Sequence, residues 1–378
     1  MTPPGVVVVG ASAAGIAAAE SARRAGFDGP ITIIGDEPHP PYTRPALSKA
    51  LLCGTESAES VHLPTPEDGI DFLPARAVGL DIARKRVTLS GGVTLEYSGV
   101  VIASGARARQ LRPDGAGETV LRSLDDAVRL REEIGGANSG LVIGGGFVGT
   151  EVASACIAAG LKTTVVSRHD TLVPHLGTDL SNLITRAAIK SGVVLKPAPQ
   201  QVRLIGTDRV AGLAAVDGSV LEADLVVTAV GCRPNIEWLD GSGLQLIDGV
   251  VVDQYCRASA GVVAAGDVVR VRGSRTLAAR TPFWTAALEQ ARTAGQSLVC
   301  GTSATPYVPA PFFWTEAFGL AITISGPIPA AGECETLAGD LRSGSGLFRW
   351  RSEQGVTVAA VNHRIAVRKL RTLSRESD

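Results

Sequence analysis

The sequence predicts an α/β protein with two doubly wound parallel sheets and a smaller β-rich α+β domain near the C-terminal end. Three observations predict this fold class: two glycine-rich turns that follow apolar runs, an internal repeat, and a change of composition after residue 305. The chain has 378 residues, which is long enough for two or three domains with cores of their own.

Two glycine-rich turns have the same context. The first turn, residues 10–15, reads Gly-Ala-Ser-Ala-Ala-Gly and follows the apolar run 6–9, and the second turn, residues 144–149, reads Gly-Gly-Gly-Phe-Val-Gly and follows the run 141–143. Each opens a stretch of helical character. Small residues let the backbone approach a pyrophosphate, and the free N–H groups at the helix start bind its charge. The two turns together predict two Rossmann-like units for two different nucleotides, between which electrons pass.

An internal repeat supports two homologous units. Segment 93–107 resembles segment 220–233, because in both Leu-Glu is followed by Gly-x-Arg, ten residues on from the Leu. A hairpin signal precedes each copy, at residues 90–92 and at residues 217–218. Residues 249–253 and 261–267 have the pattern of a further strand pair without a glycine-rich turn, and we expect them to complete the first unit.

The segment after residue 305 differs in composition. Several prolines and the triplet Phe-Phe-Trp at residues 312–314 precede short alternating runs such as residues 320–324. This pattern is typical of short strands, so a small β-rich third domain is expected.

Composition and charge exclude several classes of protein. With 36 basic and 37 acidic residues, the chain gives no reason to expect a nucleic-acid partner. No stretch reaches the roughly 18 apolar residues of a membrane span, so no membrane partner is expected. Residues 1–5 lead directly into the first strand without a leader pattern, which predicts a cytoplasmic location.

The scattered histidines show no metal-ligand spacing. The six cysteines form no CxxC or CxxxxC pair and are expected to be isolated thiols.

The residues that end the second strand of each unit predict which nucleotide binds. The strand 31–35 ends in Asp36-Glu37, and an acid there suits the hydroxyls of an unphosphorylated ribose. The strand 163–166 ends in Ser167-Arg168-His169, where an arginine matches a 2′-phosphate. The second unit is therefore expected to prefer NADPH over NADH. Alternatively, Arg168 and His169 are an exposed loop pair that Asp170 screens.

Four motifs across nearly the whole chain carry a resemblance to a known family. They are residues 41–49 (PYTRPALSK), 144–151 (GGGFVGTE), 265–267 (AGD) and 311–314 (PFFW). The sequence resembles the FAD-dependent pyridine-nucleotide oxidoreductases, and among them the ferredoxin-reductase branch, which includes the reductases of aromatic-ring dioxygenases. Related disulfide reductases carry a cysteine pair, or a lone cysteine near the Pro-Leu-Ser-Lys position. Here Ser48 holds that region and Cys53 comes later, so disulfide chemistry is not expected.

The sequence departs from the family pattern at three places. Ser12 replaces the second glycine of the first turn, Pro45-Ala46 replaces a double proline, and Ser167 stands where NADH-using relatives commonly carry an acid. Ser12 is small enough that we expect only a shift of the pyrophosphate. The Arg-His pair after Ser167 resembles glutathione reductase, in which such a pair serves NADPH.

The resemblance implies FAD in the first unit and NADPH or NADH in the second. It divides the chain into a first FAD-binding segment (1–108), an NAD(P)H-binding domain (109–235), a second FAD-binding segment (236–305) and a C-terminal domain (306–378). Members without a disulfide function are monomers or weak homodimers, and we expect the same here.

Three residues are expected to be catalytic. A lysine beside the flavin stabilises the negative charge of its reduced form, and by resemblance Lys49 has this place. Glu151 matches a glutamate near the nicotinamide ring, so the hypothesis is that Lys49 and Glu151 pair at the flavin edge and hold the nicotinamide for hydride transfer. The competing interpretation is an ordinary glutamate favoured by the helix dipole. Trp284 matches an aromatic residue at the flavin's edge, with core packing as the alternative.

Further residues are expected to bind the cofactors. By resemblance Asp267 accepts hydrogen bonds from the ribityl chain, although a turn aspartate is the alternative. Arg44 lies on the loop beside the ring system, and Arg122 matches an arginine on the FAD phosphates, with a solvated helix-start arginine as its alternative. The full set of expected cofactor-binding residues is Gly10, Ser12, Ala13, Ala14, Gly15, Asp36, Glu37, Arg44, Lys49, Val78, Ala103, Ser104, Gly105, Arg122, Gly144, Gly146, Phe147, Val148, Gly149, Glu151, Ser167, Arg168, His169, Gly231, Gly266, Asp267 and Trp284.

The expected reaction is electron transfer. A hydride carries two electrons, and a flavin can release them singly, which fits a [2Fe-2S] ferredoxin that serves an oxygenase such as a cytochrome P450. Independent support comes from basic residues near the C-terminus, which would steer an acidic partner; they are Arg364, Arg368, Lys369, Arg371 and Arg375. A solvated tail is the alternative. Rubredoxin, oxygen or a quinone-like acceptor stays open, as does another class, a cofactor-gated interaction flavoprotein like apoptosis-inducing factor.

Overall fold

The structure is a computed structural model that describes residues 4–64, 66, 69–112, 115–198, 202–215, 218–272 and 280–376. Residue 217 of the second hairpin signal lies outside this set. The chain divides into two compact units: unit 1 comprises residues 1–43, 62–107 and 233–309, and unit 2 comprises residues 44–61, 108–232 and 310–378. The contacts thus group residues 44–61 with unit 2, whereas the sequence places them in the first FAD-binding segment. The domain boundaries stay a prediction.

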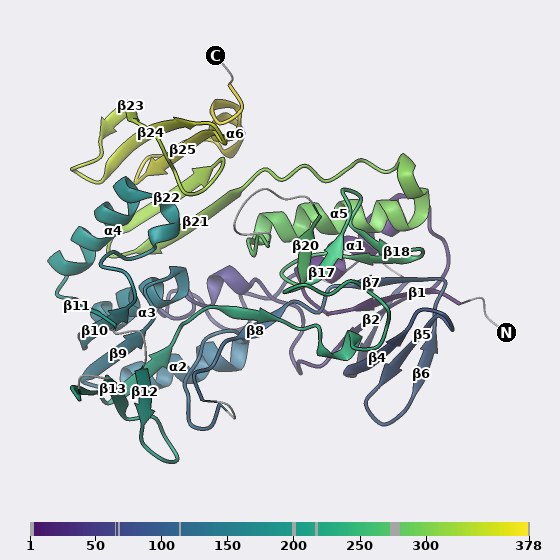
Figure 1. The fold of residues 1–378 in the computed structure, drawn as a ribbon, viewed down its shortest axis with the longest axis horizontal. Coiled ribbons are helices and arrows are strands. Elements are labelled where there is room, and N and C mark those ends of the chain that lie inside the picture. The colour runs from purple at the N-terminus through teal and green to yellow at the C-terminus, as the bar shows by residue number, and fades with distance from the viewer. Residues whose placement is uncertain are drawn as a thin grey trace. The chain divides into compact units, whose positions relative to one another are not determined.

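Unit 1 is built on a six-stranded sheet in the order β18-β19-β7-β1-β2-β3 (Figure 1). The strands are β1 (Val6–Val9), β2 (Ile31–Gly35), β3 (Ile70–Pro74), β7 (Gly99–Ile102), β18 (Arg257–Ser259) and β19 (Val262–Ala264). All neighbours pair in parallel except β18 and β19. Every residue of β1, β7 and β19 is buried, as expected for strands covered on both faces.

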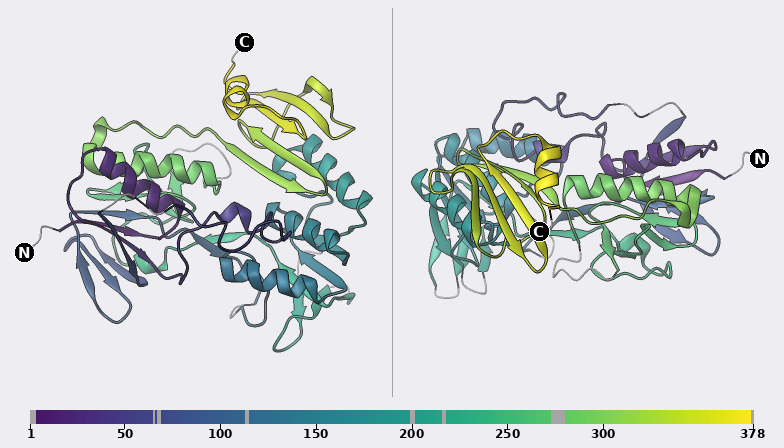
Figure 2. Two further views of the ribbon diagram at one scale, coloured as in Figure 1. Left: turned by 180° about the vertical axis from the view of Figure 1, so that it is seen from behind. Right: turned by 90° about the horizontal axis from the view of Figure 1, so that it is seen from above.

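Two helices of unit 1 pack against each other, α1 (Ala13–Arg24) and α5 (Trp284–Cys300), and they lie side by side in Figure 2. A Cβ on Gly295 of α5 would lie 2.2 Å from the carbonyl oxygen of Ala18, so only glycine allows this approach. The remaining elements of the unit are β4 (Ala77–Asp81), β5 (Arg86–Leu89), β6 (Thr94–Glu96), β17 (Val250–Val252), β20 (Val269–Val271), η3 (Glu237–Leu239) and η4 (Gly301–Ser303).

The later strands return to unit 1 as the sequence predicts, with one difference in pairing. Strand β19 adds to the main sheet beside β7. The sequence pattern suggests that β17 pairs with β19. Strand β17 instead pairs in parallel with β20. The sequence pattern of the short run 269–271 is too brief to show that it is a strand, so the true partner of β17 could not be recognised.

Unit 2 contains a second parallel sheet, in the order β11-β10-β9-β15. The strands are β9 (Ser139–Ile143), β10 (Lys162–Ser167), β11 (Val194–Pro197) and β15 (Leu225–Thr228), and the helices are α2 (Leu124–Gly135), α3 (Phe147–Ala158) and α4 (Thr178–Lys190). A meander follows, of β12 (Val202–Ile205), β13 (Gly212–Ala215) and β14 (Val220–Glu222). Short helices η1 (Arg44–Ala46) and η2 (Pro174–Leu176) also belong to unit 2, and the paired strands β8 (Ala106–Ala108) and β16 (Cys232–Pro234) lie where the chain passes from one unit to the other.

The last part of the chain forms the expected small β-rich domain. Its antiparallel sheet has the order β21-β22-β25-β24-β23. The elements are β21 (Phe312–Ala317), β22 (Leu320–Ser325), β23 (Cys334–Asp340), β24 (Ser345–Ser352), β25 (Gly355–Val361) and α6 (Val367–Leu373). Trp350 of β24 is fully buried and donates its indole N–H to Asp179 of α4 over 2.9 Å. The predicted fold class, two Rossmann-like units with a small α+β domain, is confirmed.

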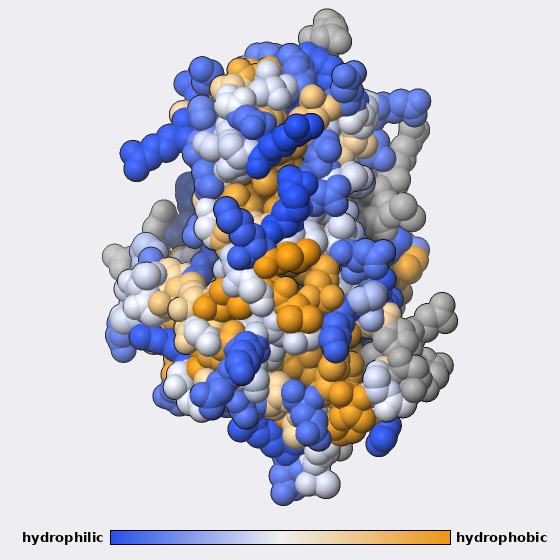
Figure 3. All heavy atoms as spheres, turned by 90° about the vertical axis from the view of Figure 1, so that its left-hand side faces the viewer, coloured by the Kyte–Doolittle hydropathy of each residue, from blue (hydrophilic) through white to orange (hydrophobic). Residues whose placement is uncertain are grey.

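Figure 3 shows a face on which hydrophilic residues surround and interrupt an apolar area that extends from the centre into the lower half. Exposed apolar side chains of unit 2 include Ile189 at the end of α4 and Val194 of β11, which are 56% and 51% exposed. Among the described residues, no helix is long and apolar enough to cross a membrane.

Candidate functional site

The first glycine-rich turn follows β1 and has the geometry that its small residues predict. Gly10 has a φ of +124°, and a Cβ there would lie 2.1 Å from the carbonyl oxygen of Ala103. A Cβ on Gly15 would lie 2.0 Å from the carbonyl oxygen of Gly10. The turn therefore requires glycine at both positions. Helix α1 begins after Ser12, whose side chain makes no capping hydrogen bond, so Ser12 leaves free the N–H groups that a phosphate would bind.

Several predicted residues of unit 1 gather at one edge of its sheet. Strands β1, β2, β7 and β19 are parallel, so their carboxyl ends lie together. Gly10, Asp36, Ala103 and Gly266 lie at or just after these ends. A Cβ on Gly266 would lie 3.2 Å from the Cβ of Ala14, which places the Gly-Asp turn against the start of α1.

The side chains of Asp36 and Glu37 differ in their surroundings. Asp36 is 59% exposed and lies 3.9 Å from Arg76, a surface pair that contributes little to stability. Its carboxylate is thus accessible to a ribose. Glu37 accepts a short hydrogen bond from the hydroxyl of Tyr42, so its orientation is fixed within the chain.

The Gly266-Asp267 turn is held by buried residues that the sequence does not reveal. Gln290 of α5 is 2% exposed, and its side-chain oxygen accepts the N–H of Gly266 over 2.9 Å. The same amide hydrogen-bonds to the hydroxyl of Tyr307, whose pKa is raised to about 12 by burial, although that hydrogen bond opposes the shift. Arg280 donates to the carbonyl oxygen of Asp267 over 3.2 Å. A glutamine within a helical pattern carries no signal that it will reach this turn.

The second glycine-rich turn repeats the geometry of the first. Gly144 has a φ of +121°, and a Cβ on it would lie 2.2 Å from the carbonyl oxygen of Ala229. A Cβ on Gly149 would lie 2.0 Å from the carbonyl oxygen of Gly144. Helix α3 begins after Gly146, which provides no side-chain cap. The pairs Gly10 with Ala103 and Gly144 with Ala229 are therefore equivalent, as the internal repeat implies.

The residues that end β10 are arranged around a buried serine. Ser167 is 4% exposed, and its hydroxyl accepts the N–H of His169 over 3.3 Å. A Cβ on Gly145 would lie 2.7 Å from that hydroxyl, so the turn passes directly over it. Arg168, His169 and Asp170 are exposed. The arginine is thus free to reach solvent beside the second turn.

Lys49 and Glu151 meet, although they are far apart in the sequence. Lys49 follows η1, and Glu151 lies in the first turns of α3. The lysine Nζ is 2.9 Å from Glu151 Oε1 and 3.0 Å from Oε2, and the side chains are 12% and 4% exposed. Lys49 also donates to the carbonyl oxygen of Pro45 over 3.4 Å. A salt bridge this deeply buried is costly to break on one side only.

Two hydroxyl groups complete the surroundings of Glu151. Ser48 donates to Oε2, and Thr315 of β21 donates to Oε1 over 2.7 Å. Thr315 is not among the site residues that the sequence predicts. The only signal for it is its place directly after the Phe-Phe-Trp triplet. The carboxylate thus has a hydrogen-bond donor on each oxygen in addition to the lysine.

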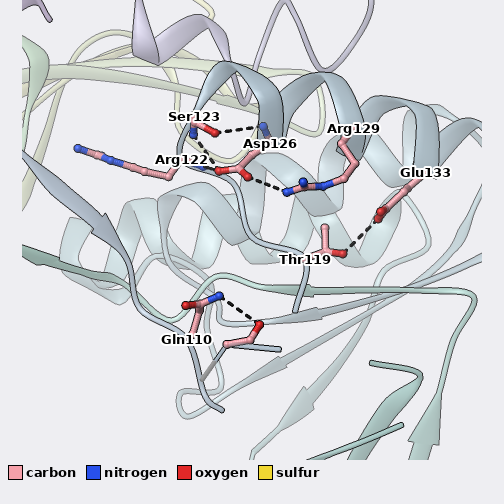
Figure 4. Close-up of polar contacts among 8 residues, drawn as sticks. Gln110, Thr119, Arg122, Ser123, Asp126, Arg129 and Glu133 are labelled. Carbon is pink, nitrogen blue, oxygen red and sulfur yellow. Dashed lines mark hydrogen bonds and ion pairs between the residues drawn. The ribbon is translucent and has the colours of Figure 1, made fainter. Parts of the chain in front are cut away.

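Arg44 and Arg122, both expected near FAD, also come together. Arg44 donates to the carbonyl oxygen of Arg122 over 2.9 Å. Arg122 precedes the capping box of α2, in which Ser123 accepts the N–H of Asp126 and the Asp126 carboxylate accepts the N–H groups of Ser123 and Arg122 (Figure 4). Figure 4 shows the Arg122 side chain pointing away from this cap. The backbone of Arg122 is therefore fixed, while its guanidinium is directed elsewhere.

Other predicted residues lie outside the contacts described above. Val78 is 48% exposed on β4, and Trp284 is the half-buried first residue of α5. Ser104 donates to the carbonyl oxygen of Asn235 over 2.8 Å, and Gly105 accepts the N–H of Asn235. Gly231 has a φ of +100° after β15. Their roles toward a cofactor stay predictions.

The six cysteines are all free. Burial raises the pKa of Cys156 and of Cys256 to about 12, which makes these thiols poor nucleophiles. Burial also raises the pKa of Cys53, and the negative charges of Glu316 and Glu151 add to the shift. Within the described part of the chain, no group of three or more His, Cys, Asp or Glu residues could hold a metal ion.

The fold and these contacts define an oxidoreductase with two dinucleotide-binding units. A family model described as "Pyridine nucleotide-disulphide oxidoreductase" matches residues 4–296, and the chain belongs to this family. It is therefore an FAD-dependent oxidoreductase.

Known relatives cover most of the chain. Rhodocoxin reductase of Rhodococcus erythropolis is 34% identical over 90% of this chain and 82% of its own length. Rubredoxin-NAD(+) reductase of Ectopseudomonas oleovorans is 34% identical over 84% of this chain and 85% of its own length. The reductase in a crystal structure of the covalent putidaredoxin reductase–putidaredoxin complex has a TM-score of 0.85 and 28% identity, over 96% of this chain and 90% of that chain.

The residues present fit FAD and a nicotinamide dinucleotide. Each glycine-rich turn leaves no room for a Cβ at its first glycine, and each opens a helix without a side-chain cap. These are the features that a pyrophosphate requires. Gly10 to Gly15 would hold the FAD pyrophosphate, and Gly144 to Gly149 would hold that of the second nucleotide.

Proposed function

We propose that the protein transfers electrons from NADPH, or less readily NADH, through FAD to a [2Fe-2S] ferredoxin that serves an oxygenase such as a cytochrome P450. The observation that carries the proposal is the buried pair of Lys49 and Glu151, the last residues of two motifs of the ferredoxin-reductase type. When bound, FAD accepts two electrons as a hydride and can release them singly.

The protein's own residues would bind and orient the reactants. The N–H groups of the two glycine-rich turns bind phosphate, and Asp36 accepts hydrogen bonds from a ribose. Lys49 provides a positive charge in a site that is largely shielded from water, where charge interactions are strong. Glu151 fixes the ammonium group of Lys49 and limits the space in which the nicotinamide ring can lie.

The end of β10 supports NADPH as the preferred donor. Ser167 is buried and carries no charge, so the position that commonly holds an acid in NADH-using relatives would not repel a 2′-phosphate. Arg168 and His169 are exposed beside it. A guanidinium recognises a phosphate through charge-assisted, often bidentate hydrogen bonds. Asp170 is exposed as well and would weaken this attraction without removing the arginine's hydrogen bonds.

The basic residues near the C-terminus support an acidic partner protein. Arg364, Arg368, Lys369 and Arg375 are exposed on or beside α6. Arg371 does not belong to this group, because its guanidinium lies 4.9 Å from the centre of the Phe312 ring and is half-buried. Glu376 is 3.6 Å from Arg349, so one of the nearby acids is already paired. The four exposed cations would steer a partner of negative charge.

The similar proteins favour an iron–sulfur protein, or a related one-electron acceptor, as the partner that receives the electrons. Rhodocoxin reductase and putidaredoxin reductase are similar to this chain, and so is a rubredoxin reductase. Rubredoxin is therefore the second candidate acceptor. The two candidates agree on the donor half of the reaction and differ only in the iron–sulfur partner.

The test is an anaerobic assay of the FAD-bound protein with NADPH as the donor. A [2Fe-2S] ferredoxin and a rubredoxin are supplied separately, and each is followed by its own visible absorbance. Reduction of the ferredoxin at a lower KM than the rubredoxin supports the proposal. Efficient reduction of rubredoxin alone favours the second candidate, and failure to reduce either protein contradicts both.

A further inference from the structure

Strand β21 lies along the first turns of α3 in matching register. The Phe313 ring contacts the Phe147 ring edge-on, with the ring centres 5.4 Å apart, and the Thr315 hydroxyl donates to Glu151 over 2.7 Å. Two residues along a strand advance about 6.7 Å, and four along a helix advance about 6 Å, so both contacts can form at once. The aromatic pair thus places Thr315 opposite Glu151.

A third contact joins the same two segments. The N–H of Phe318, just past the end of β21, donates to the Ser154 hydroxyl of α3 over 2.8 Å. Phe313 and Thr315 are 5% and 2% exposed. With contacts on both sides of it and almost no exposure, Thr315 has little freedom to turn away from Glu151.

The hydrogen bond from Thr315 fills a specific position on the carboxylate. Oε1 of Glu151 accepts from Thr315 and from Lys49, and Oε2 accepts from Ser48 and from Lys49. Glu151 is 4% exposed, so water is a poor replacement for any of these donors. Without Thr315 the carboxylate would keep Ser48 and Lys49, which lie next to each other in the sequence, and could rotate toward them.

We propose that Thr315 is a positioning residue for the reaction: its hydroxyl fixes the plane of the Glu151 carboxylate and thereby the place of the Lys49 ammonium group. The proposal rests on the proposed function, in which Lys49 and Glu151 hold the nicotinamide. It gives the C-terminal sheet a part in the chemistry, since β21 supplies the hydroxyl. Thr315 acts through Glu151 and is not itself a catalytic residue.

The first test separates binding from the chemical step in the FAD-bound protein. Thr315→Val keeps the shape of the side chain and removes the hydroxyl, Thr315→Ser keeps the hydroxyl, and Thr323→Val is the control. Thr323 lies on β22 opposite Trp314, so it points to the other face of the sheet. Stopped-flow reduction by NADPH gives a limiting rate and a dissociation constant for each variant.

The expected result is a change in rate without a matching change in binding. Thr315→Val should lower the limiting rate of flavin reduction about tenfold, while the dissociation constant of NADPH changes by less than about twofold. Thr315→Ser should recover most of the rate, and Thr323→Val should equal the parent protein. A Thr315→Val protein with the parent rate, or a Thr315→Ser protein as slow as Thr315→Val, overturns the proposal.

The second test needs no nucleotide turnover, so it stands apart from the proposed function. Glutamate labelled with 13C at the side-chain carboxyl is incorporated, and the Glu151 signal is assigned by its loss in Glu151→Gln. In the oxidised FAD-bound protein, Thr315→Val should move this signal, Thr315→Ser should return it toward the parent position, and Thr323→Val should leave it in place. An unmoved signal in Thr315→Val overturns the proposal even if the electron-transfer assay succeeds.

Discussion

Lys49 Nζ lies within 3.0 Å of both carboxylate oxygens of Glu151, and Glu151 is the more buried of the two. This difference in burial predicts which of the two substitutions costs more in the free energy of unfolding. Without Lys49, the carboxylate is left with two hydroxyl donors and no counter-charge. Without the glutamate's charge, Lys49 keeps the Pro45 carbonyl oxygen and the greater access to water.

Lys49→Met should therefore destabilise the protein more than Glu151→Gln. The expected loss in the free energy of unfolding is about 3 kcal/mol for Lys49→Met and about 1 kcal/mol for Glu151→Gln. Urea unfolding of the two variants and the parent protein, followed by circular dichroism, measures both. Equal losses would contradict the deeper burial of Glu151, which is 4% exposed against 12% for Lys49.

Replacing the first glycine of each glycine-rich turn by alanine should affect the binding of a different nucleotide in each case. Gly10→Ala places a Cβ against the Ala103 carbonyl oxygen, so the protein should be purified without FAD. Gly144→Ala creates the same collision with Ala229 and should keep FAD but lose reduction by NADPH. Gly91→Ala is the control, because Gly91 also has a positive φ, +86°, but has open space around it. If Gly144→Ala also lost FAD, the assignment of one nucleotide to each turn would be wrong.

The basic residues of α6 should matter for a protein acceptor only. Reversing the charges with Arg368→Glu and Lys369→Glu should raise the KM for a ferredoxin about tenfold at low salt and leave dye reduction unchanged. The matched control is Lys162→Glu with Lys190→Glu, which changes two exposed lysines elsewhere in unit 2. Equal losses with both acceptors, or the same KM in both double variants, would contradict docking at this surface.

Tyr307 should make the stability of the protein fall at high pH. Burial raises its pKa to about 12 in the folded state, against about 10 when unfolded. Below pH 10 both states keep the proton and the stability is unaffected; between pH 10 and 12 only the unfolded state loses it, so stability falls as pH rises. The loss relative to Tyr307→Phe should be on the order of 2 kcal/mol. Urea unfolding at pH 9 and at pH 11.5 measures it, and identical pH dependence in the two proteins would refute the burial of the hydroxyl.

Local patterns predict much of the fold. The all-valine run of β1 is typical of a strand buried on both faces, and the small residues after it require the turn that the structure shows. The internal repeat predicts the equivalence of Gly10 with Gly144, because each signal lies within a few residues of the backbone it shapes. The pairing of Lys49 with Glu151 came instead from the resemblance to a family.

Long-range contacts explain what the sequence could not predict. Thr315 reaches Glu151 across 164 residues, and Gln290 reaches Gly266 from the middle of a helix. Neither residue type has a pattern around it that indicates a partner. The grouping of residues 44–61 with unit 2 is a similar case, because it depends on where Lys49 and Ser48 find Glu151 and not on their own local sequence.

NADPH-dependent reduction of bound FAD is tested most directly by anaerobic stopped-flow measurement of flavin bleaching with NADPH and NADH in parallel, for the parent protein, Arg168→Ala and the control Arg186→Ala. Arg186 is an exposed arginine of α4. We expect rapid bleaching and tighter binding of NADPH than of NADH in the parent protein, and loss of that preference, by about tenfold or more, in Arg168→Ala only. An NADH preference in the parent protein would contradict the role of Arg168, and slow bleaching with both nucleotides would contradict the reductase itself and favour a cofactor-gated interaction protein.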